Sequence, residues 1–302
     1  MKRILKWIFV TVAACGLFIA AERFAHYKTG GFTIVNITDP HPYDTRWATE
    51  APDSATLEYV RSILAQPFYF LAPGGQTFAF QSQDGQYVLK LTKHKRMRVP
   101  LWGQWLPLPS TLEQWRRATA AKKKKIFDCT FKSYLIADTY LKEETGIVFL
   151  HLNKSDYLKQ SVTIIDKIGI AFKLNIDDFE FILQRKAELF YPHIEKLISE
   201  GEIDLVKERI HSMMTYLVGR AKRGIEDHDH CFETNLAFFN NKPFQLDIGS
   251  LRLNPAFKAH PMYCVKLREY SEELGEWLRA NHPELDSYFE DLINKMLADP
   301  NL

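Results

Sequence analysis

One apolar run near the N-terminus constrains this chain more than any other feature. Three cations within the first six residues precede the run, which extends from Trp7 to Ala21 and is closed by Glu22-Arg23. Counted from Ile4, it is about eighteen residues long, near the lower limit for a helix that crosses the hydrocarbon core of a bilayer. We therefore predict an N-terminal transmembrane or signal-anchor helix, with residues 1–27 forming a membrane anchor or signal segment.

Two other interpretations of this run stay open. Cys15 follows Val12-Ala13-Ala14 in a lipoprotein-like arrangement, which would make the segment a cleaved signal peptide. A buried core helix is the other interpretation. The cations before the run favour an N-terminus inside the cell and the rest of the chain outside.

The composition of the whole chain is that of a folded protein. It has 302 residues, of which 46% are hydrophobic, enough for one large domain or two packed lobes. Lys and Arg number 39 against 37 Asp and Glu, a balance that argues against a general nucleic-acid-binding surface. The four cysteines contain no CxxC pair, so they form no zinc framework.

The pattern of apolar residues changes along the chain from strand-like to helical. Residues 28–54 are rich in Thr, Asp and Pro and are expected to form a linker. Alternation and an Asp84-Gly85 turn then predict three antiparallel strands, followed by a helix and two more strands. These elements are expected over residues 68–71, 78–80, 87–91, 126–144, 147–152 and 162–168.

Beyond residue 175, apolar positions recur at the three-to-four spacing of helices. We expect helices over residues 177–200, 203–222, 265–281 and 284–297, interrupted by a short hairpin over 236–246. Strands first and helices second indicate a two-lobed α+β protein. The prediction is an N-lobe over residues 55–170, which includes a basic, Trp-rich insertion (94–125), and a mostly helical C-lobe over residues 171–302.

Four features stand in an informative order. Gly74-Gly75 forms a turn between two predicted strands, and Lys90 lies on the third strand. An acidic loop, Asp227-His-Asp-His-Cys-Phe-Glu-Thr-Asn235, precedes the hairpin, and Leu246-Asp247-Ile248-Gly249 ends it. A hairpin returns its second end beside its first, so we expect Asn235 and Asp247 to lie close together. Mg²⁺ prefers hard oxygen ligands, which an Asp and an Asn provide.

In this order the features resemble the protein-kinase-like superfamily, including its small-molecule kinases, and the chain looks similar to a set of poorly characterised chlamydial kinase-like proteins. The resemblance covers residues 68–249. It implies a two-lobed kinase-like fold that binds ATP and Mg²⁺. Carried over, it implies that Gly74, Gly75 and Lys90 hold the ATP phosphates, and that Asn235 and Asp247 ligate Mg²⁺.

The resemblance also implies a catalytic Asp, and here the sequence departs from the family pattern. The family usually has an Asp five residues before the Asn, a position that His230 occupies in this chain. Asp229 comes six residues before Asn235 and is our candidate for the catalytic residue, in preference to Asp227. The acidic partner of Lys90 stays open among Asp128, Asp138 and Glu143.

The same loop admits a second interpretation. His228 and His230 with the neighbouring aspartates could form a transition-metal site, although alternating residues of an extended loop point in opposite directions. The departures from the family pattern also allow a catalytically inactive pseudokinase that acts as a nucleotide-binding scaffold at a membrane. Phosphoryl transfer to a hydroxyl of a small molecule, sugar or lipid is the function we prefer.

The basic insertion suggests a second membrane contact. Residues 94–125 contain Trp102, Trp105 and Trp115 together with three clusters of Lys and Arg. Tryptophan with Lys and Arg is typical of an element at the interface of anionic membranes, and a solvated helix start is the alternative. We expect the membrane to be contacted through residues 4–21 and possibly through this segment. Because a kinase needs ATP, we expect the folded part in the cytoplasm, against the charge bias of the N-terminus.

Overall fold

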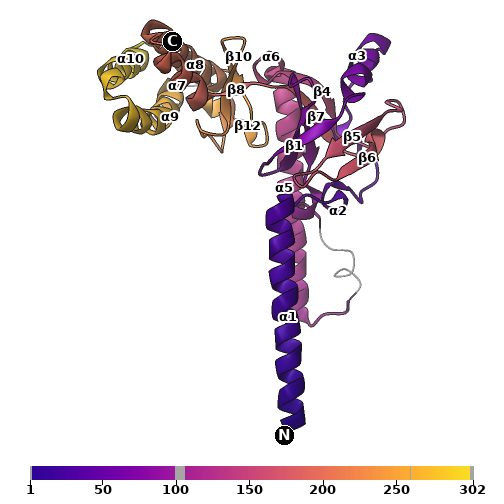
Figure 1. The fold of residues 1–302 in the computed structure, drawn as a ribbon. Helices are drawn as coiled ribbons and strands as arrows, with labels where there is room; N and C mark the ends of the chain where they lie inside the picture. Colours follow the sequence, from indigo (N-terminus) through magenta and orange to yellow (C-terminus); the bar gives the residue numbers. More distant parts are fainter. Residues whose placement is uncertain (1, 99–105, 259, 300–302) are drawn as a thin grey trace. The chain divides into compact units, whose positions relative to one another are not determined.

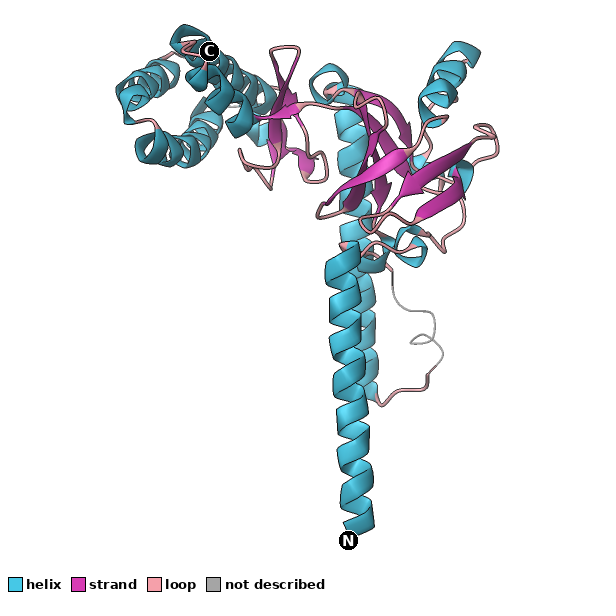
Figure 2. Cartoon of the chain, in the orientation of Figure 1, coloured by secondary structure: helices cyan, strands magenta, loops and turns pink. Residues whose placement is uncertain are grey.

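The structure is a computed structural model that describes residues 2–98, 106–258 and 260–299. Its contacts divide the chain into two compact units. Unit 1 consists of residues 1–123 and 151–183, and unit 2 of residues 124–150 and 184–302. Both contain helices and strands, as the α+β prediction requires (Figure 2). The division differs from the predicted lobes, which meet at residue 170, because a helix and a strand between residues 124 and 150 belong with the later part of the chain.

Unit 1 is built on one sheet, and most of its helices precede the first strand in the sequence (Figure 1). Its helical elements are α1 (Lys2–Thr29), α2 (Ile34–Ile37), η1 (Thr45–Trp47), α3 (Ser54–Leu64), η2 (His94–Arg96) and the first part of α5 (Ser110–Tyr140). Its strands are β1 (Phe68–Pro73), β2 (Thr77–Ser82), β3 (Tyr87–Thr92), β5 (Ser161–Ile165), β6 (Ala171–Asn175) and residues 181–183 of β7 (Phe181–Arg185).

The order of these strands across the sheet is β7-β3-β2-β1-β5-β6. The first three in the sequence are antiparallel, as predicted, whereas β1 and β5 run parallel. Asp84-Gly85 turns the chain between β2 and β3, and Gly85 adopts φ +72°, a conformation that favours glycine. The pairing of Lys90 with Ala79 and of Leu91 with Phe78 fixes which side chains share a face.

The segment expected as a linker packs on this sheet. Phe32, Ile37 and Trp47 are all buried, although they lie within residues 28–54. The ring of Phe32 meets the rings of Phe78 and Phe80 edge to face, at 5.3 and 5.2 Å between centroids. The Thr, Asp and Pro content of this stretch masked three buried apolar residues, of which Phe32 packs against the sheet.

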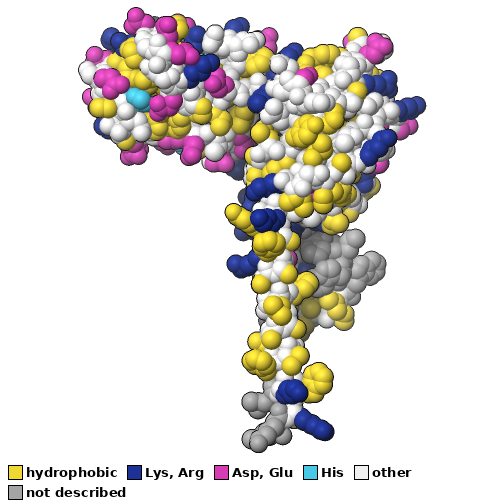
Figure 3. Space-filling model, in the orientation of Figure 1, with side chains coloured by type: hydrophobic (Ala, Val, Ile, Leu, Met, Phe, Trp, Pro, Cys, Tyr) yellow, Lys and Arg dark blue, Asp and Glu magenta, His cyan; other side chains and the backbone are white. Residues whose placement is uncertain are grey.

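α1 is the predicted N-terminal helix. Residues Lys6–Thr29 are long and apolar enough to cross a membrane, and none of their most apolar window is buried. Figure 3 shows apolar side chains along α1 and Lys or Arg side chains near both of its ends. The helix ends where Gly30 and Gly31 adopt φ +64° and +75°, so the chain turns at the first position where two glycines allow it.

Unit 2 combines helices with two small sheets, one of three strands and one of two. Its helices are residues 124–140 of α5, α6 (Lys142–Thr145), α7 (Phe190–Ser199), α8 (Ile203–Lys222), η4 (Pro255–Lys258), α9 (His260–Asn281), η5 (Pro283–Leu285) and α10 (Asp286–Ala298). Its strands are β4 (Ile147–His151) without its last residue, β8 (Glu188–Leu189), β9 (Ile225–Asp227), β10 (Leu236–Phe239), β11 (Lys242–Gln245) and β12 (Leu251–Leu253).

The core of unit 2 forms between α7, α8, α9 and α10 and the strand β10. Met213, Leu217 and Leu274 are fully buried there, and Phe232 and Phe238 contribute aromatic rings. The rings of Phe190 and Phe238 stack at 5.7 Å. This core holds the base of the predicted hairpin, whose strands β10 and β11 pair as expected.

The helix predicted over residues 177–200 is wrong in its first half. That stretch contains η3 (Ile176–Asp178), β7 and β8, and only α7 is helical. Phe181, Ile182 and Leu183 are all fully buried, so consecutive rather than periodic residues face apolar surroundings. A strand covered on both sides therefore mimics the apolar content of a helix.

Candidate functional site

The late hairpin brings two of the predicted site residues together. Asn235 precedes β10, Asp247 follows β11, and the pairing of Leu236 with Gln245 closes the hairpin beside them. The backbone amide of Leu246 donates to the carbonyl of Asn235 at 2.8 Å, and the amide of Asp247 lies 3.4 Å from the same oxygen. An amide and a carboxylate side chain are thereby held at adjacent backbone positions.

The carboxylate of Asp247 is oriented by its own turn. Its Oδ1 accepts a hydrogen bond from the amide of Gly249 at 2.9 Å, and the side chain is half-buried. Its charge also acts on Tyr134 of α5: burial first, and then the nearby Asp247, raise the pKa of the Tyr134 phenol. The hydroxyl of Tyr134 therefore stays protonated beside this carboxylate.

Helix α5 fixes the Asp247-Ile248-Gly249 segment through a single buried hydroxyl. Ser133 Oγ donates to the carbonyl of Ile248 at 2.6 Å and accepts from the amide of Leu251 at 2.6 Å. Both backbone groups are thereby satisfied away from water, and the segment is tied to one side of the helix. The sequence offered no signal for this serine, because its role depends on a contact with residues far along the chain.

Asn235 is buried, with both ends of its side chain engaged. Its Nδ2 donates to the carbonyl of Asp229 at 2.5 Å, and its Oδ1 accepts from Thr234 Oγ1 at 2.8 Å. A carbonyl oxygen has two lone pairs, so Oδ1 can still bind a cation. Asn235 Oδ1 and the carboxylate of Asp247 are hard oxygen donors few enough to leave room for water and phosphate oxygens, and this donor set fits Mg²⁺.

The two aspartates of the acidic loop differ sharply in environment. Asp229 is exposed, and only its backbone is fixed: its amide donates to Asp227 Oδ1 at 3.2 Å. Asp227 is 1% exposed, and its carboxylate accepts from Ser250 Oγ, Arg220 Nη1 and Gln245 Nε2 at 2.5, 3.3 and 3.0 Å. Asp227 is therefore engaged in structural hydrogen bonds, and of the two aspartates Asp229 is the one that a solute can reach.

A buried arginine, which sequence reasoning missed, organises this loop. Arg220 of α8 is 1% exposed and donates to Asp227, to Gln245 Oε1 and to the hydroxyl of Tyr270, the last at 3.1 Å. Although burial acts against the charge, Tyr270 and Asp227 raise the pKa of Arg220, so it stays cationic. Its only signal in the sequence is an arginine within the apolar residues of a helix (Val218, Ala221).

The alternating loop does not gather its histidines. His228 Nε2 lies 3.3 Å from Glu226, whereas the ring of His230 packs against Tyr270 at 4.7 Å between centroids. Within the described residues, the group of His and acidic side chains close enough to hold a metal ion is a different one, Asp39, His94 and Glu180 of unit 1. A transition-metal site in the acidic loop therefore has no support from these contacts.

The remaining predicted residues lie in unit 1. Lys90 is half-buried on β3, and Gly74-Gly75 forms the turn between β1 and β2. A Cβ on Gly74 would lie 3.2 Å from the carbonyl of Thr77, whereas one on Gly75 would meet nothing within 4 Å. Lys90 and the Asn235–Asp247 pair thus belong to different units, and their convergence on one nucleotide stays a prediction.

Two further predictions receive partial information. Asp138, a candidate partner of Lys90, lies 3.3 Å from Lys142 Nζ, and Glu143 lies in α6 rather than α5. Trp102 and Trp105 of the basic insertion lie outside the described residues, and Trp115 is 68% exposed on α5.

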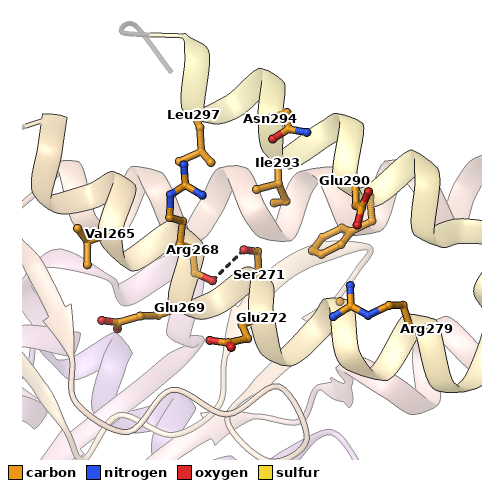
Figure 4. A pocket seen from close by; sticks show the side chains of 12 residues that line it. Val265, Arg268, Glu269, Ser271, Glu272, Arg279, Glu290, Ile293, Asn294 and Leu297 are labelled. Atoms are coloured by element: carbon orange, nitrogen blue, oxygen red, sulfur yellow. Dashed lines mark hydrogen bonds between the residues drawn. The ribbon is translucent and has the colours of Figure 1, made fainter.

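A pocket of unit 2 is separate from these residues. It has a volume of about 640 Å³ and lies between α9 and α10 (Figure 4). Arg268 and Arg279 are set there against Glu269, Glu272 and Glu290, so the charges of its lining nearly cancel. A highly charged anion such as a triphosphate has no electrostatic reason to prefer it.

Comparisons with known proteins add little. No protein-family model and no curated protein matches the chain. Two solved structures are similar at low identity. The bifunctional kinase-methyltransferase WbdD has a TM-score of 0.36 and 14% identity over 72% of this chain, and the chain spans only 43% of its length. Rv3197 from Mycobacterium tuberculosis, solved with erythromycin, has a TM-score of 0.31 and 12% identity over 85% of this chain and 68% of its own.

Proposed function

We propose that this protein is a membrane-tethered, kinase-like phosphotransferase that uses ATP and Mg²⁺. The observation that carries the proposal is the pairing of Asn235 and Asp247 at the base of one hairpin, with the Asp247 carboxylate oriented by Gly249. An amide oxygen and a carboxylate held together in this way are the protein ligands that a phosphate-bound Mg²⁺ accepts.

In this proposal the chain positions the reactants and the nucleotide supplies the chemistry. ATP, when bound, donates its γ-phosphoryl group: the bond to the ADP oxygen breaks, a bond to the acceptor oxygen forms, and the acceptor hydroxyl loses its proton. Asn235 and Asp247 would hold Mg²⁺, Lys90 would neutralise the phosphates, and the Gly74-Gly75 turn would approach them through its backbone. The acceptor we favour is a hydroxyl of a small molecule, sugar or lipid.

The two aspartates of the acidic loop differ in whether they can accept a proton from the acceptor hydroxyl. Asp229 is exposed, and Asp227 is fully engaged by Arg220, Gln245 and Ser250. A carboxylate with that many donors has no free oxygen for a substrate proton. If Asp229 does not accept the proton, the protein is a pseudokinase that binds nucleotide at a membrane without transferring the phosphoryl group.

The test uses the full chain in lipid nanodiscs. Thermal stability with and without ATP and Mg²⁺ reports binding, and release of inorganic phosphate from ATP, with water as the acceptor, reports transfer. We expect Asp247→Asn to lose the ATP- and Mg²⁺-dependent stabilisation. Asp229→Asn should keep that stabilisation and lose most of the phosphate release, because only the proton acceptor is removed.

Asp204→Asn is the matched control, since this α8 carboxylate lies in the same unit and is fully exposed. It should alter neither readout. Unchanged nucleotide binding in Asp247→Asn would refute the metal-ligand assignment. If the unmodified chain binds ATP and Mg²⁺ but releases no phosphate, it does not transfer the phosphoryl group to water, and the pseudokinase alternative is favoured.

The proposal also assigns α1 to the membrane and the two units to the cytoplasm, where ATP is available. Its apolar, unburied span supports the first assignment, and the cations before the span oppose the second. Labelling Lys173→Cys, at an exposed position of β6, with a membrane-impermeant maleimide tests the topology. Labelling in intact cells would place the units outside and exclude an ATP-dependent kinase there.

A further inference from the structure

A strongly basic pocket of about 520 Å³ lies in unit 1 where the end of α1 meets the sheet. Five chain segments form it: the end of α1, α2, the β1–β2 turn, the segment after β3 and the tip of the β5–β6 hairpin. The lining residues that matter here are Tyr27, Gly74, Lys93, Lys95, Arg96 and Lys167.

The four cations of this pocket have no acidic partner. Among the residues that the structure describes, none of them forms an ion pair with a carboxylate. Lys93 Nζ donates to the carbonyl of Gly74 at 2.5 Å and lies 4.2 Å from the ring centroid of Phe78, and Arg96 donates to the carbonyl of Gly75 at 3.0 Å. Burial, and then the charge of Arg96, lower the pKa of Lys93 to about 8. Mutual repulsion is therefore left uncompensated, and an anion would relieve it.

This pocket shares the Gly74-Gly75 turn with the proposed nucleotide site, but its cations lie on the other face of the sheet from Lys90. Successive side chains of a strand point to opposite faces, and Lys90 pairs with Ala79 whereas Leu91 pairs with Phe78. Lys93 lies over Phe78, and Phe32, which follows α1, packs on the same ring. The pocket therefore lies on the Phe78 face of the sheet, opposite to the face on which Lys90 stands.

The position of the pocket at the end of α1 indicates the kind of anion. The span Lys6–Thr29 has 24 residues, about 36 Å of helix, against a hydrocarbon core of about 30 Å. Its last turns carry Arg23, Phe24, Tyr27 and Lys28, the residue types that anchor helices at a membrane surface. A helix placed in this way leaves its C-terminal end, and the pocket beside it, among lipid headgroups.

The β5–β6 hairpin, which contributes Lys167, also exposes two apolar side chains that could contact a membrane. Ile168 and Ile170, next to Lys167, are 50% and 49% exposed. The ammonium of Lys167 lies 5.5 Å from the ring centroid of Tyr27 in α1, so the hairpin tip is close to the end of the span. Exposed isoleucines beside a basic residue suit the boundary between headgroups and acyl chains.

We propose that this pocket binds the phosphate of an anionic phospholipid headgroup and so fixes unit 1 at the membrane surface. The inference rests on the part of the proposed function that assigns α1 to a membrane, and it is independent of phosphoryl transfer. Lys95 and Arg96 belong to the basic insertion expected to contact lipid, whereas Lys167 and Tyr27 extend that contact to parts of the chain far from it in sequence.

The test compares two double variants of the full chain in nanodiscs of phosphatidylcholine with phosphatidylglycerol. Lys95→Gln with Lys167→Gln removes two exposed pocket cations, and Lys159→Gln with Lys173→Gln removes two exposed lysines of unit 1 outside the pocket. Native mass spectrometry after extraction counts the phosphatidylglycerol retained for each chain. We expect the pocket variant to lose its preference for phosphatidylglycerol by about tenfold and the control to keep it.

Three results would overturn the proposal. The unmodified chain could retain both lipids equally, the control variant could lose as much as the pocket variant, or inorganic phosphate at millimolar concentration could displace the lipid from the unmodified chain. Stabilisation by ATP and Mg²⁺ is measured on the same samples. The pocket variant should keep it, because Lys90 is untouched, so failure of the lipid site and failure of the kinase proposal are separately visible.

Discussion

Two sets of cations in this molecule have opposite surroundings, one inside the core of unit 2 and the other around a pocket of unit 1. In unit 2, Arg220 is surrounded by Asp227, Gln245 and Tyr270, and its two terminal nitrogens donate to all three of them. In unit 1, Lys93 and Arg96 share a pocket with two further lysines and find only backbone carbonyls as acceptors. The first arrangement is closed, and the second is open to an anion.

This difference distinguishes cations that stabilise the fold from cations that are available to bind a ligand. A buried cation that is matched by a carboxylate and by neutral acceptors holds its surroundings in one conformation, and removing it leaves those partners unsatisfied. Clustered cations without a carboxylate are held together by the fold against their repulsion. Burial, and then the charge of Arg96, lower the pKa of Lys93 to about 8, whereas the pKa of Arg220 is raised. The predictions below test both halves of this contrast.

The largest effect is expected for Arg220→Met. Removing the guanidinium leaves Asp227 as an uncompensated buried carboxylate, which should lower the free energy of unfolding of unit 2 by about 3–5 kcal/mol. Hydrogen exchange of the β9 and β11 peptides, measured by mass spectrometry on the full chain in nanodiscs, is the direct readout. Arg223→Met is the control, because the ion pair of Arg223 with Glu144 is exposed to solvent and should contribute about 1 kcal/mol or less. Equal effects of both variants would remove the distinction between a matched buried charge and a surface ion pair.

Ser133→Ala should come next in size. The variant loses a hydrogen bond to the carbonyl of Ile248 and one from the amide of Leu251, both buried, so we expect about 2 kcal/mol of local destabilisation. Because these bonds hold the segment that carries Asp247, faster exchange of residues 247–251 and weaker stabilisation by ATP and Mg²⁺ should appear together. Ser271→Ala removes an exposed bond within α9, to the carbonyl of Arg268 (Figure 4), and should change neither. Destabilisation without faster exchange at residues 247–251 would show that Ser133 acts elsewhere.

Local patterns predicted the parts of this molecule whose partners lie close in the sequence. The β1–β2–β3 meander, α8 and the β10–β11 hairpin follow from alternation, helical spacing and turn residues, and the approach of Asn235 to Asp247 follows from the hairpin alone. The structural roles of Ser133 and Arg220 were not predicted, because each residue bonds to partners in other elements. The buried strand β7 was not predicted for a related reason. Its continuous apolar run depends on the elements that pack on it, and these lie outside any local window of the sequence.

A substitution at Gly30, which follows α1 and lines the basic pocket, should destabilise unit 1 by an intermediate amount. Gly30 has φ +64°, and a Cβ there would lie 2.8 Å from Cζ of Phe70, so Gly30→Ala carries both backbone strain and a clash. We expect about 1–2 kcal/mol of destabilisation of unit 1. Gly169→Ala shares the strained φ, +87°, but has no neighbour within 4 Å and isolates the backbone contribution. Limited proteolysis of unit 1 in nanodiscs should be faster for the first variant than for the second; equal rates would mean that contact between α1 and the sheet adds nothing.

The smallest expected effect is a dependence of the stability of unit 1 on pH. It tests most directly whether the pocket cations, unlike Arg220, lack a compensating partner. The pKa of Lys93 is about 8 in the folded chain and near 10.5 when unfolded, so below pH 8 both states carry the proton and the folded state bears the full cost of a confined charge. Between pH 8 and 10.5 the unfolded state binds more protons, and the stability of unit 1 should rise with pH relative to Lys93→Met. The gain should stay below about 1 kcal/mol, because solvent screens a half-buried group. An anion in the pocket would favour charged Lys93, so phosphatidylglycerol should shift the rise to higher pH. Parallel pH profiles for the unmodified chain and Lys93→Met, with or without that lipid, would mean that Lys93 bears no uncompensated charge.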